Sequence, residues 1–108
     1  MVQGIGGVFY EHMRYDDVGN PATTTFMDYL LPTAAEVPDL EYGHVVTPGT
    51  TPGGHKGLGE GGAIASPAAL LNAVRDALAP LGIPVNDQPM SPDRILDLIE
   101  QSGPRHAD

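Results

Sequence analysis

The sequence contains no cysteine and no tryptophan, and only 5 of its 108 residues are lysine or arginine. The missing cysteine excludes disulfides, thiolate metal ligands and a cysteine nucleophile. The formal net charge of −9 at pH 7 argues against nucleic-acid binding, because contact with phosphates requires clustered cationic side chains. No apolar run approaches the roughly 20 residues of a membrane-spanning helix, and the first residues lack the basic-then-apolar pattern of a secretory signal.

Aromatic residues are also scarce, whereas 14 glycines and 11 prolines make up 25 of the 108 residues, about twice the usual share. A chain of this length corresponds to one small domain, whose core has to come mainly from Ala, Leu, Val and Ile. We predict an α+β fold with about three helices, one short strand pair or hairpin and a Gly-rich loop. The predicted domain spans residues 1–104, and residues 105–108 form a frayed tail.

Apolar residues at three- and four-residue steps predict a first helix from Val2 to Tyr15, with tight packing where glycines interrupt it. Two later helices carry the same start signal, a serine cap followed by proline, at Ser66 and Ser91. The first of these ends at Gly82 and the second at Gly103–Pro104. The apolar stripe of the Ser66 helix consists of Leu70, Leu71, Val74, Leu78 and Leu81, and that of the Ser91 helix of Ile95, Leu96, Leu98 and Ile99.

Between the first helix and the later two, the chain is rich in turn-forming residues. Residues 16–21 predict a turn, and residues 22–31 predict a loop with a short helical or extended piece. The segment 40–47 (LEYGHVVT) is the best strand candidate, because it ends in β-branched residues. Residues 47–62 contain seven glycines and two prolines. This composition is typical either of a flexible linker or of a loop whose backbone lies against a ligand, and it leaves both open.

The Gly-rich segment presents a single carboxylate, Glu60. Residues 57–62 match the dinucleotide-binding pattern GxGxxG, but no apolar strand precedes them and the carboxylate would repel a pyrophosphate. A Walker A loop is excluded because glycine follows Lys56. Flanking glycines let the backbone approach a bulky ligand, and a carboxylate in a poorly solvated site can act as a general base. The pattern therefore favours a site at Glu60.

Residues 56–62 (KGLGEGG) resemble the KGxGEGG motif of the molybdenum hydroxylases, the large molybdopterin-binding subunits of the xanthine dehydrogenase, aldehyde oxidase and aerobic carbon monoxide dehydrogenase group. Further segments resemble the same family in the same order. They are VQGIG at 2–6, Tyr-Glu at 10–11, YDDVG at 15–19, FMDYLLP at 26–32, TPGG at 51–54, and NAV, DAL and LG between 72 and 82. The resemblance covers about residues 2–102. It implies the C-terminal end of a cytoplasmic subunit several times longer.

The resemblance also implies a mechanism and a set of site residues. Glu60 corresponds to the catalytic general base, which takes a proton from the oxygen that is transferred to the substrate. Gly57, Gly59, Gly61 and Gln3 are the predicted cofactor contacts, and no residue is assigned as a metal ligand. For Gln3, the sequence favours a role in helix packing over contact with the cofactor. The implied cofactor is molybdopterin, in its cytosine dinucleotide form, with molybdenum, and iron–sulfur clusters and FAD are expected on partner subunits. The substrate is a small molecule.

Several polar residues keep two interpretations. Lys56 either offsets nearby negative charge or pairs with a surface acid, and His55 either lines the mouth of the pocket or is an exposed loop residue. The four histidines (His12, His44, His55 and His106) lack the paired spacing of a metal site. The competing function is a non-catalytic acidic interaction module, or an orphan fragment without cofactor.

A piece of a larger subunit should expose apolar side chains where the rest packs. The predicted exposed residues are Val8, Phe9, Phe26, Tyr29 and Leu30. We therefore expect association with the remainder of the large subunit, or a homodimer of the separate chain.

Overall fold

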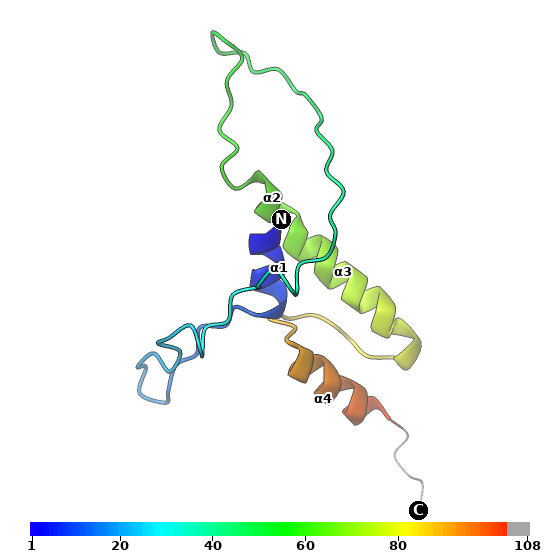
Figure 1. The fold of residues 1–108 in the computed structure, drawn as a ribbon. Coiled ribbons are helices and arrows are strands. Elements are labelled where there is room, and N and C mark those ends of the chain that lie inside the picture. Colours follow the sequence, from blue (N-terminus) through cyan, green and yellow to red (C-terminus); the bar gives the residue numbers. More distant parts are fainter. Residues whose placement is uncertain (104–108) are drawn as a thin grey trace, which may run out of the picture.

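A computed structural model describes residues 1–103, and within them the fold consists of helices joined by long loops (Figure 1). The helices are α1 (Val2–Phe9), α2 (Gly61–Ile64), α3 (Ser66–Leu78), the 3₁₀ turn η1 (Ala79–Leu81) and α4 (Pro92–Ser102). Pro104 and the predicted tail at 105–108, which includes His106, lie outside the described residues.

The core lies where α1, α3 and the segment after η1 meet. Its buried members are Val8, Leu78, Ile83, Val85 and Met90. The Met90 amide donates a 2.6 Å hydrogen bond to the Val8 carbonyl, which ties the segment before α4 to α1. Leu70, Leu71, Val74, Ile95 and Leu98 pack around this core. The predicted stripes of α3 and α4 are thus confirmed in part, but Leu81, Leu96 and Ile99 are exposed.

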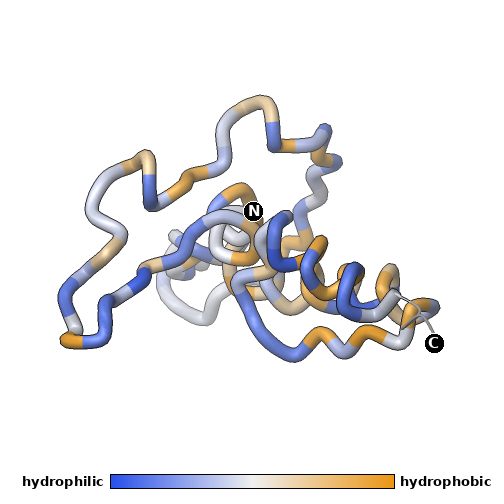
Figure 2. The backbone as a smooth tube through the Cα atoms, turned by 90° about the horizontal axis from the view of Figure 1, so that it is seen from below, coloured by the Kyte–Doolittle hydropathy of each residue, from blue (hydrophilic) through white to orange (hydrophobic). Residues whose placement is uncertain are grey.

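The molecule is much more open than a compact domain of its size. Its radius of gyration is 18.5 Å, against about 13 Å expected for a compact domain of this length. Its accessible surface is 8633 Å², whereas a compact protein of this mass exposes about 5,700 Å². Figure 1 shows the reason: the loop before α2 and the arm after α1 both project from the helices. Apolar stretches recur along these projecting loops (Figure 2).

The predicted exposed residues divide between the core and the surface. Val8 is fully buried, so this prediction is wrong, because the segment after η1 returns to cover it. Phe9 and Tyr29 are half-buried. Phe26 is 78% exposed and Leu30 is also exposed, as predicted. Exposed apolar residues therefore gather on the loops and not on the inner face of α1.

The first helix is shorter than predicted, ending at Phe9 instead of Tyr15. The amides of Tyr10 and Glu11 both donate to the Gly6 carbonyl, which closes the helix. Beyond it, the Arg14 amide donates to the buried Thr23 hydroxyl at 3.0 Å. The arm that turns back at residues 16–20 competes for these backbone groups. The spacing of apolar residues along the sequence gives no information about this competition.

No strand forms among residues 1–103, so the strand pair of the predicted α+β fold is wrong for this part of the chain. The only strand-like pairing described there is an isolated antiparallel bridge between Tyr15 and Pro21. Segment 40–47 lacks a partner, and Val45 is 90% exposed within it. A β-strand needs a neighbouring strand for its hydrogen bonds, whatever its propensity.

The helix boundaries follow the predicted signals only in part. Ser91 is the N-cap residue of α4, although its side chain makes no capping hydrogen bond. Gly82, with φ of +68°, ends the helix pair α3–η1 in the left-handed region. Ser66, by contrast, is the first residue of α3, with Ala65 at the cap position, so its predicted capping role is wrong. Residues 25–29 form one turn through the Tyr29 amide and the Thr25 carbonyl, which confirms a short piece within a loop.

Candidate functional site

The Gly-rich segment is a long exposed loop that returns to the helices at its end. A turn closes its tip, where the Gly54 amide donates to the Thr51 carbonyl at 2.8 Å. Lys56 donates to the Thr47 hydroxyl at 3.0 Å across the two arms of the loop. Among the described residues, Lys56 therefore forms no ion pair with a surface acid, because a neutral hydroxyl accepts its hydrogen bond. His55 is an exposed loop residue in this chain.

Glu60 lies at the foot of this loop, immediately before α2. There it meets Gln3, which stands in the first turn of α1. The Gln3 Nε2 lies 3.5 Å from the Glu60 Oε1, at the outer limit of hydrogen bonding, and both side chains are exposed. Two predicted site residues that are 57 positions apart are thus brought together at the same end of the helices.

The remaining predicted contacts, Gly57, Gly59 and Gly61, lie next to this pair in the sequence. Gly57 and Gly59 have no other heavy atom within 4 Å of an added Cβ, and neither has a positive φ. Gly61 differs, because a Cβ there would overlap the Leu58 side chain. Neither packing nor backbone conformation in this chain therefore requires glycine at 57 or 59. The open space at these two positions is available to a group from outside the chain.

An apolar groove of about 440 Å³ adjoins the foot of the loop. It runs between α1 and the α2–α3 segment, with the loop residues Pro38 and Leu40 on its far side. Gly61 and Gly62 form part of its lining. No sequence motif indicates this groove, and small lining residues such as Ala65 and Ala69 are the local signal for it.

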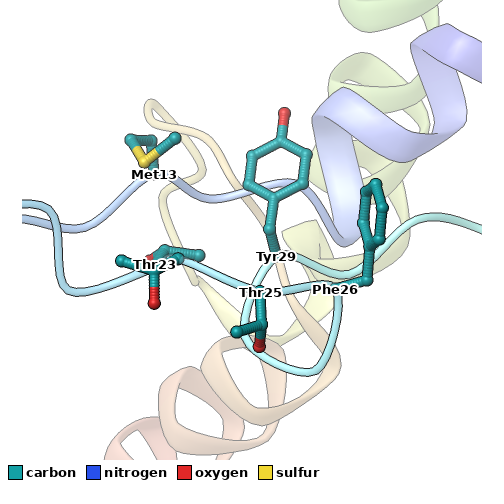
Figure 3. Close-up of a pocket in the computed structure, with 6 residues that line it drawn as sticks. Met13, Thr23, Thr25, Phe26 and Tyr29 are labelled. Atoms are coloured by element: carbon teal, nitrogen blue, oxygen red, sulfur yellow. The ribbon is translucent and has the colours of Figure 1, made fainter.

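A second, smaller pocket of about 220 Å³ lies on the arm after α1, between Met13, Thr23 and the turn at residues 25–29 (Figure 3). In Figure 3 the rings of Phe26 and Tyr29 rise from the same side of this turn. The Tyr29 hydroxyl donates to the Glu11 carboxylate at 2.6 Å. This hydrogen bond, with partial burial and the carboxylate charge, raises the pKa of Tyr29. The contact holds the turn next to the segment that follows α1.

Residues 1–103 lack two other kinds of functional feature. No group of three or more His, Asp or Glu side chains there is placed to hold a metal ion. Among the same residues, no helix has the length and apolar character needed to cross a membrane.

Comparison with known proteins identifies the family. The profile of the molybdopterin cofactor-binding domain matches residues 1–38. The chain is 43% identical over 110 residues to the nicotine 6-hydroxylase large subunit of Paenarthrobacter nicotinovorans, an alignment that covers 97% of this chain and 14% of that protein. It superimposes on quinoline 2-oxidoreductase from Pseudomonas putida 86 with a TM-score of 0.84 and 46% identity, over 93% of this chain and 13% of that one. Over nearly its whole length, the chain is thus homologous to a segment of molybdenum hydroxylase large subunits.

The crystal structure of Cu,Mo-CO dehydrogenase in the carbon monoxide reduced state agrees with this assignment. Its TM-score is 0.85 at 35% identity, covering 94% of this chain and 13% of that one. The chain spans about one seventh of the length of these relatives. The alignments cover nearly all of this chain but only a small part of each relative. An open shape agrees with this, because the matching segment of a relative is accompanied by a much longer remainder of that protein.

The residues around Glu60 fit a molybdopterin group chemically. Such a group carries phosphate and other hydrogen-bond acceptors, and the Gln3 carboxamide is a donor that lies beside Glu60. The unfilled space at Gly57 and Gly59 leaves backbone N–H groups accessible to a neighbouring anion.

Proposed function

We propose that this chain supplies the general-base glutamate and the glycine loop of a molybdenum hydroxylase large subunit. The reaction would be the oxidative hydroxylation of a carbon centre, or the oxidation of carbon monoxide, with oxygen derived from water. The observation that supports this proposal is the meeting of Gln3 and Glu60 at the foot of the loop. The relatives named above act on nicotine, quinoline and carbon monoxide according to their names, and the substrate class here is a small molecule.

The proposal assigns roles to Glu60, Gln3 and the three glycines. A carboxylate Oε of Glu60 accepts the proton of the oxygen nucleophile, as a general base within hydrogen-bonding reach does. Gln3 contacts the cofactor through its carboxamide and restrains the direction of the Glu60 side chain. Gly57, Gly59 and Gly61 bring their backbone amides close to the cofactor, which side chains at 57 and 59 would prevent. The rest of the subunit encloses this exposed end and excludes water.

The cofactor in this proposal is molybdopterin in its cytosine dinucleotide form, with molybdenum. When bound, it supplies the two-electron redox chemistry, while the protein supplies position and proton affinity. Iron–sulfur clusters and FAD on partner subunits carry the electrons away. The names of two relatives, the subunit gamma of a dehydrogenase complex and a large chain, say that those proteins belong to assemblies.

The remainder of the large subunit is the proposed partner of the exposed surface. The chain exposes about 2,900 Å² more surface than a compact protein of its mass, and side chains such as Phe26 and Val46 contribute to it. Burial of surface on this scale is typical of an obligate interface. We place the assembled enzyme in the cytoplasm.

The substitution Glu60→Gln in the complete molybdenum-containing complex tests the proposed base. We expect turnover to fall by at least about a hundredfold, the range for loss of a general base, while the metal content is retained. Glu41→Gln is the matched control, because Glu41 is also an exposed glutamate of the loop region, and its turnover should equal that of the wild type. Wild-type turnover in Glu60→Gln would refute the assignment.

The second candidate function is a non-catalytic acidic interaction module. The exposure of Glu60 and the small core of the separate chain favour it. It predicts that the chain purifies alone as a stable, metal-free monomer and does not join a molybdenum-containing complex when the rest of a large subunit is co-expressed. Capture of the chain in such a complex, with molybdenum present, would exclude this candidate.

A further inference from the structure

Two helices approach each other unusually closely at Gly4 of α1. Gly4 is buried, and a Cβ added to it would overlap the Ser66 hydroxyl and lie 2.7 Å from the Ser66 Cβ. Real Cβ atoms do not come this close to other atoms without a shift of the structure. Glycine at position 4 and a small side chain at position 66 therefore set how closely α1 and α3 pack.

The Ser66 hydroxyl is buried and has no hydrogen-bond partner among residues 1–103. A buried hydroxyl without a partner is unfavourable, and Ser66 does not cap its helix. What the side chain does here is fill the volume that Gly4 leaves open. The two residues are complementary in size, one without a side chain and the other with a two-atom side chain.

This contact lies next to both members of the candidate site. Gln3 directly precedes Gly4 in α1, and Glu60 is joined to Ser66 only through the four-residue α2 and Ala65. Because both connections are short, the separation of the helices at Gly4 and Ser66 is transmitted to Gln3 and Glu60. Their atoms already stand 3.5 Å apart, so a wider helix separation breaks the interaction.

We propose that Gly4 and Ser66 are positioning residues, whose contact sets the helix separation at which Gln3 meets Glu60. The geometric part of this inference stands on the chain alone, and its catalytic meaning rests on the proposed function. Gly7 provides a comparison within the same helix, because an added Cβ there meets nothing within 4 Å. Gly7→Ala changes helix propensity as Gly4→Ala does, but it introduces no steric contact.

Thiol crosslinking measures the positioning directly, since the chain contains no cysteine of its own. The pair Gln3→Cys/Glu60→Cys, treated with a short bifunctional thiol reagent, reports the site. The pair Glu11→Cys/Tyr29→Cys reports the fold at the other end of α1, where the native side chains are hydrogen-bonded. Gly4→Ala should slow crosslinking of the first pair about tenfold, in line with overpacking of a helix contact, and leave the second unchanged. Gly7→Ala should leave both rates unchanged.

The size complementarity is tested by rescue. Ser66→Gly removes both Ser66 atoms that a methyl group added at position 4 would meet, and the next neighbour, the Pro67 Cδ, lies at an ordinary 3.6 Å. The double variant Gly4→Ala/Ser66→Gly should therefore recover the wild-type crosslinking rate at the site. An unchanged rate in Gly4→Ala, an equal loss in both cysteine pairs, or a failure of this rescue would each overturn the positioning role.

The complete complex separates this inference from the proposed function. In that complex, Gly4→Ala should lower kcat with little change in KM, and the double variant Gly4→Ala/Ser66→Gly should have the wild-type kcat. Slower crosslinking together with a wild-type kcat would refute the catalytic role of the Gln3–Glu60 geometry while supporting the positioning contact. Unchanged crosslinking would refute the positioning contact, whatever the outcome of Glu60→Gln.

Discussion

Truncation of Val8 to alanine tests whether the small core holds the helices together. Val8 has no exposed surface, and its carbonyl accepts the 2.6 Å hydrogen bond from Met90. The substitution removes two methyl groups, each worth about 0.8 kcal/mol when buried, and leaves a cavity that adds to the cost. We expect the free energy of unfolding to fall by about 2–3 kcal/mol. This is a large share of the total for a chain of this length.

The assay is urea denaturation of the 108-residue chain followed by far-UV circular dichroism, with Val45→Ala as the matched control. The control removes the same two methyl groups from a side chain that is 90% exposed, so its effect should stay within about 0.5 kcal/mol. Equal effects of the two substitutions would refute the reasoning, because burial would then not determine the stability of this fold.

Two further predictions concern a glycine and a tyrosine. Gly82→Ala should lower the free energy of unfolding by about 1–2 kcal/mol, because φ of +68° strains an L side chain. Gly57→Ala should leave thermal stability unchanged and lower the molybdenum content of the complete complex. Equal destabilisation by the two substitutions would contradict this prediction. The pKa of Tyr29 lies above its ordinary value of 10.0, so its stabilising contribution is present below pH 10.0 and is lost as the pH rises through the folded-state pKa. The urea midpoint should therefore fall more steeply with alkaline pH in the wild type than in Tyr29→Phe, and parallel curves would count against the Glu11 contact.

The helices near the end of the described chain follow from their local sequence. Pro67 and Pro92 sit in the first turns where proline is tolerated, and Gly82 ends α3–η1 because glycine readily enters the left-handed region. The segments that failed depend on partners. Residues 40–47 have the composition of a strand but no neighbour to pair with, and α1 ends early because the arm at residues 14–23 competes for backbone groups.

The candidate site shows the same division. The type and spacing of residues 56–62 mark Glu60 and its glycines as candidates, because a chemical motif is local. The meeting of Glu60 with Gln3 depends on how closely α1 and α3 pack, which Gly4 and Ser66 set from two distant parts of the sequence. The separation of α1 and α3 cannot be derived from a local sequence pattern. Contacts between residues far apart in sequence arise only when the chain has folded, and these contacts determine which polar groups share one surface.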